Sequence, residues 1–171
     1  MEFRPDPVWT ERYERERERL ERHTDPSAVF HVGSTAVPDL AGTPQLDVIA
    51  VYDDASAMWD AADTVVGLDE RWRRTDREHR TVVYWRDPPE AVYLKLHLPG
   101  DEQVHNQIAV RDHLRADEPD RRRYERVKRE TAAEHDGFQP YQEAKAEIVQ
   151  ELIETARETG RFAALPESVR E

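Results

Sequence analysis

The sequence predicts an α+β fold: one central mixed β-sheet flanked by helices, with a helical C-terminal part. Runs rich in β-branched and aromatic residues, bounded by turn residues, occupy much of the first hundred of the 171 residues. Helical periodicity prevails beyond them, and no internal repeat or low-complexity linker interrupts the chain. The length suits one domain over residues 1–171, with a sheet core at about 25–100 and a helical part at about 101–160.

The amino-terminal half alternates helices and strands. Asp6 followed by Pro7 is typical of a helix start, because aspartate caps the first turn and proline fits its first position. The strands are rich in valine and other apolar residues, and glycine and proline punctuate the segment between them. The predicted elements are a helix to about His23, strands at 28–32 and 45–52 around a turn-rich segment at 33–44, and a helix from Asp54 or Ser56 to Gly67.

The remainder is predicted to form a β-hairpin and then helices. Two strongly apolar runs, TVVYWR and AVYLKLHL, flank a Pro-Pro turn, so we expect them to pair as antiparallel strands. Ile148, Leu152 and Ala156 recur at helical spacing and mark the buried stripe of the last helix. The predicted elements are a weak strand at 71–75, strands at 81–86 and 91–98 around a turn at 87–90, and helices at about 103–116, 119–135 and 140–159.

Composition excludes several classes of protein. The absence of cysteine excludes disulfides, thiolate metal sites and a cysteine nucleophile. The apolar runs are too short to cross a bilayer, and the first residues lack the apolar segment of a secretory signal, so a cytoplasmic location without membrane contact is expected. A net charge of −12 argues against the binding of bulk nucleic acid.

Arginine greatly outnumbers lysine among the 25 basic residues, because only Lys95, Lys128 and Lys145 are lysines. High acidity, arginine far above lysine and no cysteine are together typical of halophilic, high-GC organisms such as haloarchaea. The acidic surface therefore reflects either salt adaptation or recognition of a partner, and a single carboxylate is weak evidence for a site. Lys128 and Lys145 each follow a tyrosine by four residues, which suits either an anion-binding ammonium or a lysine stem packed on the ring.

The segment HVGSTAVPDLAGTPQLDVIAV, residues 31–51, carries the strongest sign of a site. Its first strand ends at Gly33, where the backbone can approach a ligand, and Ser34, Thr35 and nearby N–H groups can hold a phosphate oxygen. Asp47 lies inside the next strand, where a carboxylate is costly unless it is paired, hydrogen-bonded or bound to metal. A tight glycine turn beside an aspartate that caps a neighbouring loop is the alternative.

This segment resembles the opening motif of the GrpB family, which belongs to the nucleotidyltransferase superfamily, where Gly-Ser precedes a carboxylate-bearing strand. Later pieces agree with the family in order: LKLHL, VRDHLRAD, and the pairs Tyr124–Lys128 and Tyr141–Lys145. The resemblance implies a nucleotidyltransferase-like fold and a nucleotide or related ligand. Relatives joined to dephospho-CoA kinase in some bacteria point toward nucleotide or coenzyme A metabolism.

The superfamily signature needs a second carboxylate two residues after the first, because positions i and i+2 of a strand share a face. Asp47 fits the first position, but Ile49 occupies the second and cannot ligate a metal. Asp53 would share a strand face with Asp47, but it lies six residues further on, roughly 20 Å along an extended strand. Asp47 is therefore the catalytic candidate, and two-magnesium nucleotidyl transfer should be weak or absent.

A third carboxylate is expected on a later strand, and the run 91–98 presents His97 instead, on the face that carries Lys95. Asp47 and His97 are predicted to share one cleft, with the Gly-Ser turn at its rim, and to hold a single divalent ion. The candidate ions are manganese, zinc and magnesium, and an imidazole ligand favours the first two. A metal-free hydrogen bond between the two side chains is the alternative.

Cationic side chains supply candidate contacts for a phosphate. Lys95 shares the strand face of His97, and Arg111 and Arg115 lie one helical turn apart on one face. The expected substrate-binding residues are Gly33, Ser34, Thr35, Lys95, Arg111, Arg115 and Lys145, with Asp47 and His97 as metal ligands and His31 as a further candidate.

These residues predict a nucleotidyltransferase-like protein that binds a nucleotide or another phosphate-bearing small molecule, with one divalent metal at most. Transfer of a nucleotidyl group depends on whether the incomplete carboxylate set permits it. The alternative is a non-catalytic module with a degenerate site that senses or carries a nucleotide or a coenzyme A-related anion. A structural protein with a vestigial pocket is disfavoured, because Gly33, Ser34 and Asp47 are all present beside a polar strand face.

Overall fold

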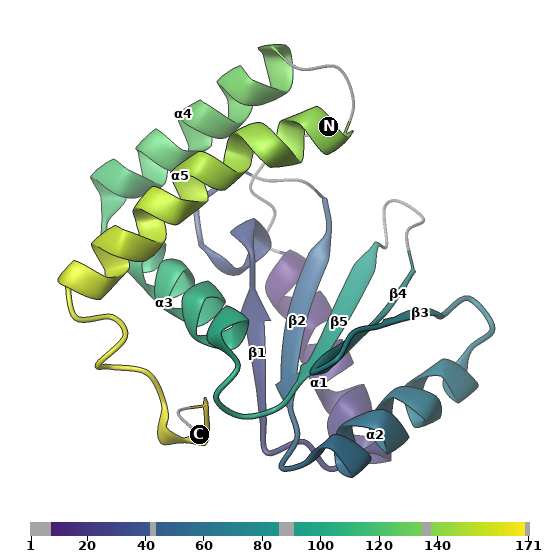
Figure 1. Ribbon diagram of the computed structural model, residues 1–171. Helices are drawn as coiled ribbons and strands as arrows, with labels where there is room; N and C mark the ends of the chain where they lie inside the picture. The colour runs from purple at the N-terminus through teal and green to yellow at the C-terminus, as the bar shows by residue number, and fades with distance from the viewer. Residues whose placement is uncertain (1–7, 42–43, 86–90, 135–137, 170–171) are drawn as a thin grey trace.

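The central sheet of the computed structural model has five strands in the order β1-β2-β5-β4-β3 (Figure 1). The pair β2–β5 is parallel and the other neighbouring strands are antiparallel, which confirms the mixed sheet. The strands are β1 (Ala28–Val32), β2 (Leu46–Val51), β3 (Arg73–Asp76), β4 (Arg80–Trp85) and β5 (Val92–His97). The structure describes residues 8–41, 44–85, 91–134 and 138–169, and for 138–142 and 144 the backbone alone.

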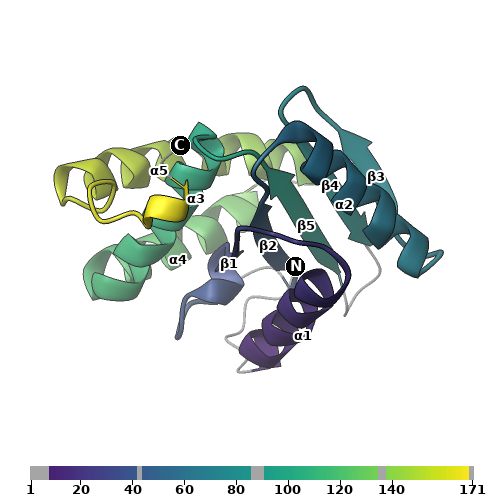
Figure 2. The same cartoon turned by 90° about the horizontal axis from the view of Figure 1, so that it is seen from below.

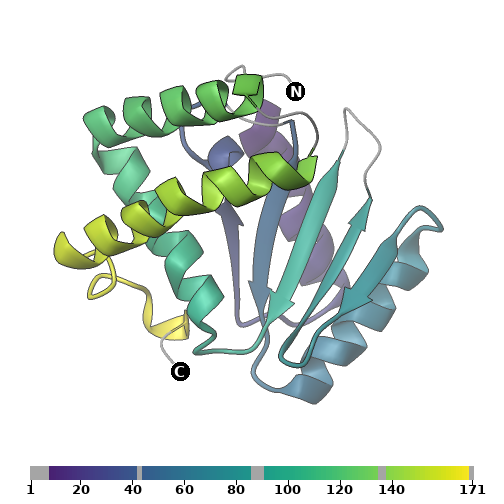
Figure 3. The same cartoon turned by 45° about the horizontal axis from the view of Figure 1, so that its top comes forward.

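Helices cover both faces of the sheet. α1 and α2 pack on one face and α3 on the other, where α4 and α5 run side by side (Figures 1 and 3). Figure 2 shows α3, α4 and α5 grouped on one side of the molecule, away from α1 and α2. None of the helices within the described ranges is long and apolar enough to cross a bilayer. The helices are α1 (Val8–His23), α2 (Ala55–Leu68), α3 (Glu102–Ala116), α4 (Glu118–Glu134), α5 (Phe138–Glu158) and the 3-10 turns η1 (Ser34–Ala36) and η2 (Glu167–Val169).

The predicted α+β fold is confirmed, and the predicted elements agree with the observed ones to within two residues at each end that the structure describes. The predicted hairpin strands pair antiparallel as β4 and β5. Of the two candidate caps of α2, Asp54 is the observed one, since its side chain accepts a hydrogen bond from the Ala57 amide at 2.8 Å. Two predicted features, the helix start at Asp6-Pro7 and the turn at 87–90, lie outside the described residues.

Strand parity divides the central strands between two cores. Val48 of β2 and Leu94 of β5 are fully buried against α1 and α2. Ile49, one position on, is fully buried on the opposite face against α3. Each such aliphatic side chain contributes about 1.5–3 kcal/mol. Asp47 and Lys95 share the parity of Ile49, so the pleat turns both of them toward the face that α3 covers.

Candidate functional site

A cavity of about 500 Å³ lies on this face of the sheet, at the amino-terminal end of β2. Residues of β2, β5, α3, α4 and α5 line it, together with the turn that follows β1. Its described wall combines cationic, amide and apolar side chains with one carboxylate. The charged lining residues are Asp47, Lys95, Arg111, Lys128 and Lys145, and the amides are Gln45, Gln103, Asn106 and Gln107.

Asp47 is held by protein groups in the floor of the cavity. Its Oδ1 accepts a hydrogen bond from Gln45 Nε2 at 2.9 Å and lies 3.3 Å from Lys95 Nζ. Lys95 Nζ also donates to Gln107 Oε1 of α3 at 3.4 Å. The carboxylate therefore has the partners that a buried charge requires without a metal ion.

Gly33 is required by its approach to Asp47. Its φ is 78°, a left-handed conformation that side chains other than glycine rarely adopt. A Cβ at this position would lie 2.8 Å from Asp47 Oδ2. The group that approaches Gly33 closely in the structure is the Asp47 carboxylate, whereas the approach of a ligand to Gly33 stays a prediction. Ser34, the next residue, lines the cavity as expected.

Lys128 is an almost fully buried cation, with 2% of its surface exposed. Its Nζ lies 5.1 Å from the centroid of the Tyr124 ring, so the ammonium itself contacts the tyrosine four residues before it. Burial, and next the charge of Lys145, lower the pKa of Lys128 to about 7. Burial also lowers the pKa of Lys145.

The cavity gathers every lysine of the chain. Only three of the 25 basic residues are lysines, and Lys95, Lys128 and Lys145 all line this one cavity. They come from β5, α4 and α5, so the fold brings together residues that are far apart in the sequence. A compact ammonium binds an anion as a point charge, whereas arginine is favoured elsewhere in this chain.

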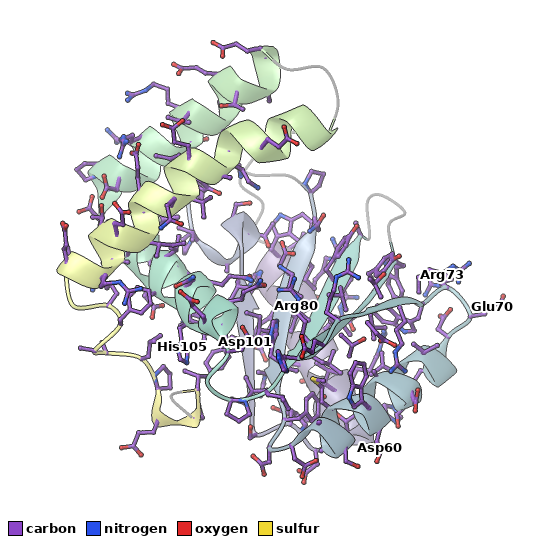
Figure 4. The ribbon with its side chains drawn as sticks, in the orientation of Figure 1. Asp60, Glu70, Arg73, Arg80, Asp101 and His105 are labelled. Atoms are coloured by element: carbon purple, nitrogen blue, oxygen red, sulfur yellow. The ribbon has the colours of Figure 1, made fainter. Side chains whose placement is uncertain are left out.

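The predicted shared site of Asp47 and His97 is wrong. Both side chains face the same side of the sheet, but Asp47 is paired with Tyr93 whereas His97 is paired with Val51, four residues or about 13 Å further along. His97 is fully buried, and its Nδ1 lies 3.0 Å from Oδ2 of Asp101, the residue labelled in Figure 4. Parity fixed the face correctly, but it did not fix the position along the strand.

Within the described part of the chain, no second carboxylate joins Asp47 to make the pair of a two-metal centre. Ile49, at the position of the second carboxylate, is buried against α3. Asp54 caps α2 at the far end of β2, and Asp53 is exposed beside it. Asp47 is the one carboxylate among the described lining residues, and it faces more cations than acids. The donor set therefore does not fit the divalent metals that a nucleotidyltransferase-like fold implies.

Of the remaining predicted residues, some line the cavity and others hold the turn after β1 in place. Arg111 lines the cavity, but its guanidinium pairs with Asp112 at 2.8 Å and donates to the His31 carbonyl at 3.1 Å. Arg115 donates to the Ala36 carbonyl at 2.9 Å and is not among the lining residues. Thr35 also lies outside the lining, with its Oγ1 3.0 Å from His31 Nε2. These contacts fasten the turn after β1 to α3.

His31 is a structural group. Its ring stacks on Tyr13 of α1, with centroids 5.0 Å apart. Burial, and next the charge of Arg115, lower the pKa of His31 to about 4, so the ring is neutral at neutral pH. His31 is not among the described residues that line the cavity.

Sequence reasoning missed the amide side of the cavity. Gln103, Asn106 and Gln107 recur at helical spacing on α3, and this polar row was the available signal. Asn106 Oδ1 is buried and has no hydrogen-bond partner among the described residues. A buried acceptor left in this state favours a ligand that supplies a donor.

A separate cluster of three polar side chains lies at the junction of α3 and α4. His113, Asp117 and Asp120 place one ligand atom each within 4.8 Å of one another, a spacing that suits a metal ion. Protein contacts already use them: His113 Nε2 lies 2.7 Å from Asp120 Oδ2, and Asp117 Oδ1 accepts from the Asp120 amide at 2.9 Å. These bonds join the two helices outside the cavity.

Solved structures place the fold in a known class. A crystal structure of the conserved protein GrpB from Enterococcus faecalis is similar over 91% of this chain and 97% of that one, with a TM-score of 0.72 at 21% identity. A cytoplasmic RNA terminal U-transferase is similar over 74% of this chain and 40% of that one, with a TM-score of 0.53 at 13% identity. The fold is therefore nucleotidyltransferase-like.

Sequence comparison identifies the family. The model of the GrpB protein family matches residues 3–155, and the chain belongs to this family. The UPF0157 protein SCO7215 of Streptomyces coelicolor is 34% identical over 84% of this chain and 77% of its own. The UPF0157 protein BH1888 of Halalkalibacterium halodurans is 34% identical over 90% of this chain and 80% of its own. The resemblance found in the Gly33–Asp47 segment is thus confirmed.

Proposed function

We propose that the protein binds a phosphate-bearing small molecule, a nucleotide or a coenzyme A-related anion, without a metal ion. The ligand would occupy the cavity that β2 and β5 line together with α3, α4 and α5. The observation that carries this proposal is the gathering of all three lysines around one cavity. The chain otherwise uses arginine, and of its lysines Lys128 is buried and Lys145 is half-buried at this cavity. This choice and placement favour a site built for an anion.

The rest of the wall suits an organic body attached to that anion. Val110, Leu114 and Val149 form an apolar side, and Tyr124 adds an aromatic ring. The amides of α3 offer donors and acceptors to a base or a sugar. A pocket of this size, with an apolar side and polar groups that converge on it, is typical of small-molecule sites.

Binding is proposed here rather than nucleotidyl transfer, because the described residues give Asp47 no second carboxylate of the kind that a metal-dependent transfer requires. Two metal ions need shared carboxylates to hold them and to offset their mutual repulsion. Asp47 instead pairs with Lys95. In this proposal Asp47 orients Lys95 and Gln45 at the floor of the cavity.

Calorimetric titration with ATP, AMP and coenzyme A tests the proposal, once in EDTA and once in magnesium. We expect at least one ligand to bind equally well under both conditions. A ligand at a hundredfold excess over its Kd should then raise the free energy of unfolding by about 2.7 kcal/mol. Binding that requires magnesium, or no binding of any phosphate compound, would contradict the proposal.

A matched pair of variants localises the binding. Lys145→Met removes a cation that lines the cavity and should weaken binding about tenfold or more. Arg122→Met removes a cation from the outer side of α4, where 77% of the side chain is exposed, and should leave binding unchanged. Equal effects of the two variants would show that only overall charge matters.

A further inference from the structure

The sheet face that borders the cavity continues beyond it onto β4. The hydrophobic cluster under α3 and α5 takes its strand residues from β1 and β2, and none of its described members belongs to β4 or β5. In Figures 1 and 3 the helices of this face stand over β1 and β2, with β4 and β3 beside them. Half-buried Arg80, Val82 and Tyr84 of β4 alternate with buried residues of the opposite face, and Figure 4 labels Arg80. Within the described ranges, β4 therefore presents this face to the surface.

Two tyrosines form a ring stack on this face. Tyr84 of β4 and Tyr93 of β5 are register partners, and their ring centroids lie 5.3 Å apart with the ring planes only 8° from parallel. Both residues are half-buried, so each of them is reached in part by solvent. A cross-strand aromatic pair of this kind stabilises a hairpin by itself. The place of the pair beside the cavity indicates a second role.

The stack ends at the edge of the cavity. Tyr93 is the register partner of Asp47 across the parallel pair β2–β5, and Lys95 follows Tyr93 by two residues on the same face. Asp47 and Lys95 both line the cavity, whereas neither tyrosine of the stack is among the described lining residues. The tyrosine pair therefore lies at the rim of the cavity, on the side of β4.

The order of the strands decides which face of the Tyr93 ring is turned to the cavity. Tyr84 covers the face that points toward β4, so the other face points toward β2 and Asp47. Neighbouring strands lie about 4.8 Å apart, and stacked aromatic rings have their centroids about 4.5–7 Å apart. A planar ring bound above Asp47 would thus continue the stack by one member. Tyr84 already holds the Tyr93 ring in place, which lowers the ordering cost of binding.

We infer that Tyr93, backed by Tyr84, stacks on the base of the ligand whose phosphate lies in the cavity. This inference rests on the proposed function and restricts its ligand class to phosphate esters that carry an aromatic base. Tyrosine stacking holds a base through its π face whatever its edge groups, so the platform selects for a base rather than for one particular base. A single nucleotide suits it better than a nucleic-acid strand, because the net charge of −12 opposes a long polyanion.

AMP and ribose 5-phosphate test the inference, because they share the sugar and the phosphate and differ in the base. Calorimetry in EDTA gives the affinity for AMP, and displacement of AMP gives the affinity for ribose 5-phosphate. AMP should bind at least about tenfold more tightly because one base stacks. AMP that binds no better than ribose 5-phosphate would overturn the platform, and the proposed function would stand if either compound, ATP or coenzyme A binds. If none of the four binds, the proposed function falls as well.

Variants at Tyr93 separate stacking from hairpin stability. Tyr93→Leu removes the ring and should lower the affinity for AMP about tenfold while leaving that for ribose 5-phosphate unchanged. Tyr93→Phe keeps the ring and should keep the affinity for AMP. Val82→Ala is the control, because Val82 is half-buried on the same face opposite Lys95 and carries no ring, so the ratio of the two affinities should stay the same. A ratio that Tyr93→Leu leaves unchanged, or that Val82→Ala lowers as much, would show that the stack only supports the hairpin.

Discussion

The polar face of β2 and β5 has two ends, which differ in whether their polar side chains border an open cavity or are buried by protein. At one end, Asp47 and Lys95 pair at the floor of an open cavity. At the other end, His97 is fully buried against Asp101, which also caps α3 by accepting from the Gln103 amide at 2.9 Å. The first end can receive a ligand, whereas the second fastens the sheet to the helix that follows.

The difference shows how little a polar residue on a strand says about its role. The same alternation places Lys95 and His97 on one face, two residues apart. What separates them is the packing above the sheet: α4 and α5 leave space over one end, and the junction of β5 with α3 closes the other.

The largest expected effect concerns Lys128 at the open end. The folded protein releases the Lys128 proton near pH 7, whereas an unfolded lysine keeps its proton to about pH 10.5. The unfolded state therefore binds more protons between these values, and this group makes stability rise with pH across that window. Lys128→Met should remove a rise on the order of 3–5 kcal/mol, measured without ligand as the difference in unfolding free energy between wild type and variant. Identical pH profiles would show that Lys128 is well solvated.

His97→Ala tests the closed end. The substitution removes a fully buried ring and leaves Oδ2 of Asp101 without its histidine partner, so the free energy of unfolding should fall by about 3 kcal/mol. The affinity for a phosphomonoester should change less than twofold in the variant that remains folded. Denaturant unfolding and calorimetry measure the two quantities, and loss of binding would show that the two ends act as one site.

Gly33→Ala tests how the open end is built. The new Cβ would approach Asp47 Oδ2 to 2.8 Å at a backbone φ of 78°. We expect a loss of about 2 kcal/mol in unfolding free energy together with weaker ligand binding, because the Asp47 carboxylate must move. As a control, Gly67→Ala adds a Cβ that meets no atom within 4 Å and should be neutral or slightly stabilising. Equal stability of the two variants would contradict the assigned contact.

Asn106→Leu has the smallest expected effect. Asn106 Oδ1 has no hydrogen-bond partner within the described structure, so its loss should cost little stability or even increase it. If a ligand donor reaches this oxygen, affinity should fall by about five- to tenfold. Gln103→Leu, one turn earlier on the same helix and exposed, should have a weaker effect. Unchanged affinity in Asn106→Leu would remove α3 from ligand recognition.

The fold could be predicted from the sequence because its strands and helices carry strong local patterns between clear breakers. Asp47 could also be predicted, since a carboxylate inside an apolar strand needs a partner. The error at His97 had a specific cause: the register of β2 on β5 depends on long-range packing that strand parity does not encode. The convergence of Lys128 and Lys145 on Lys95 depends on how α4 and α5 fold back, which no local pattern records.

A crystal structure with AMP and manganese present together would show whether the cavity binds phosphate without a metal ion, because manganese scatters anomalously and can be located without bias. We expect a phosphate bound between Lys128 and Lys145, and no anomalous peak at Asp47 or His97. A manganese ion that joins Asp47 to the phosphate would contradict the metal-free site and would restore metal-dependent nucleotidyl transfer as the function to test.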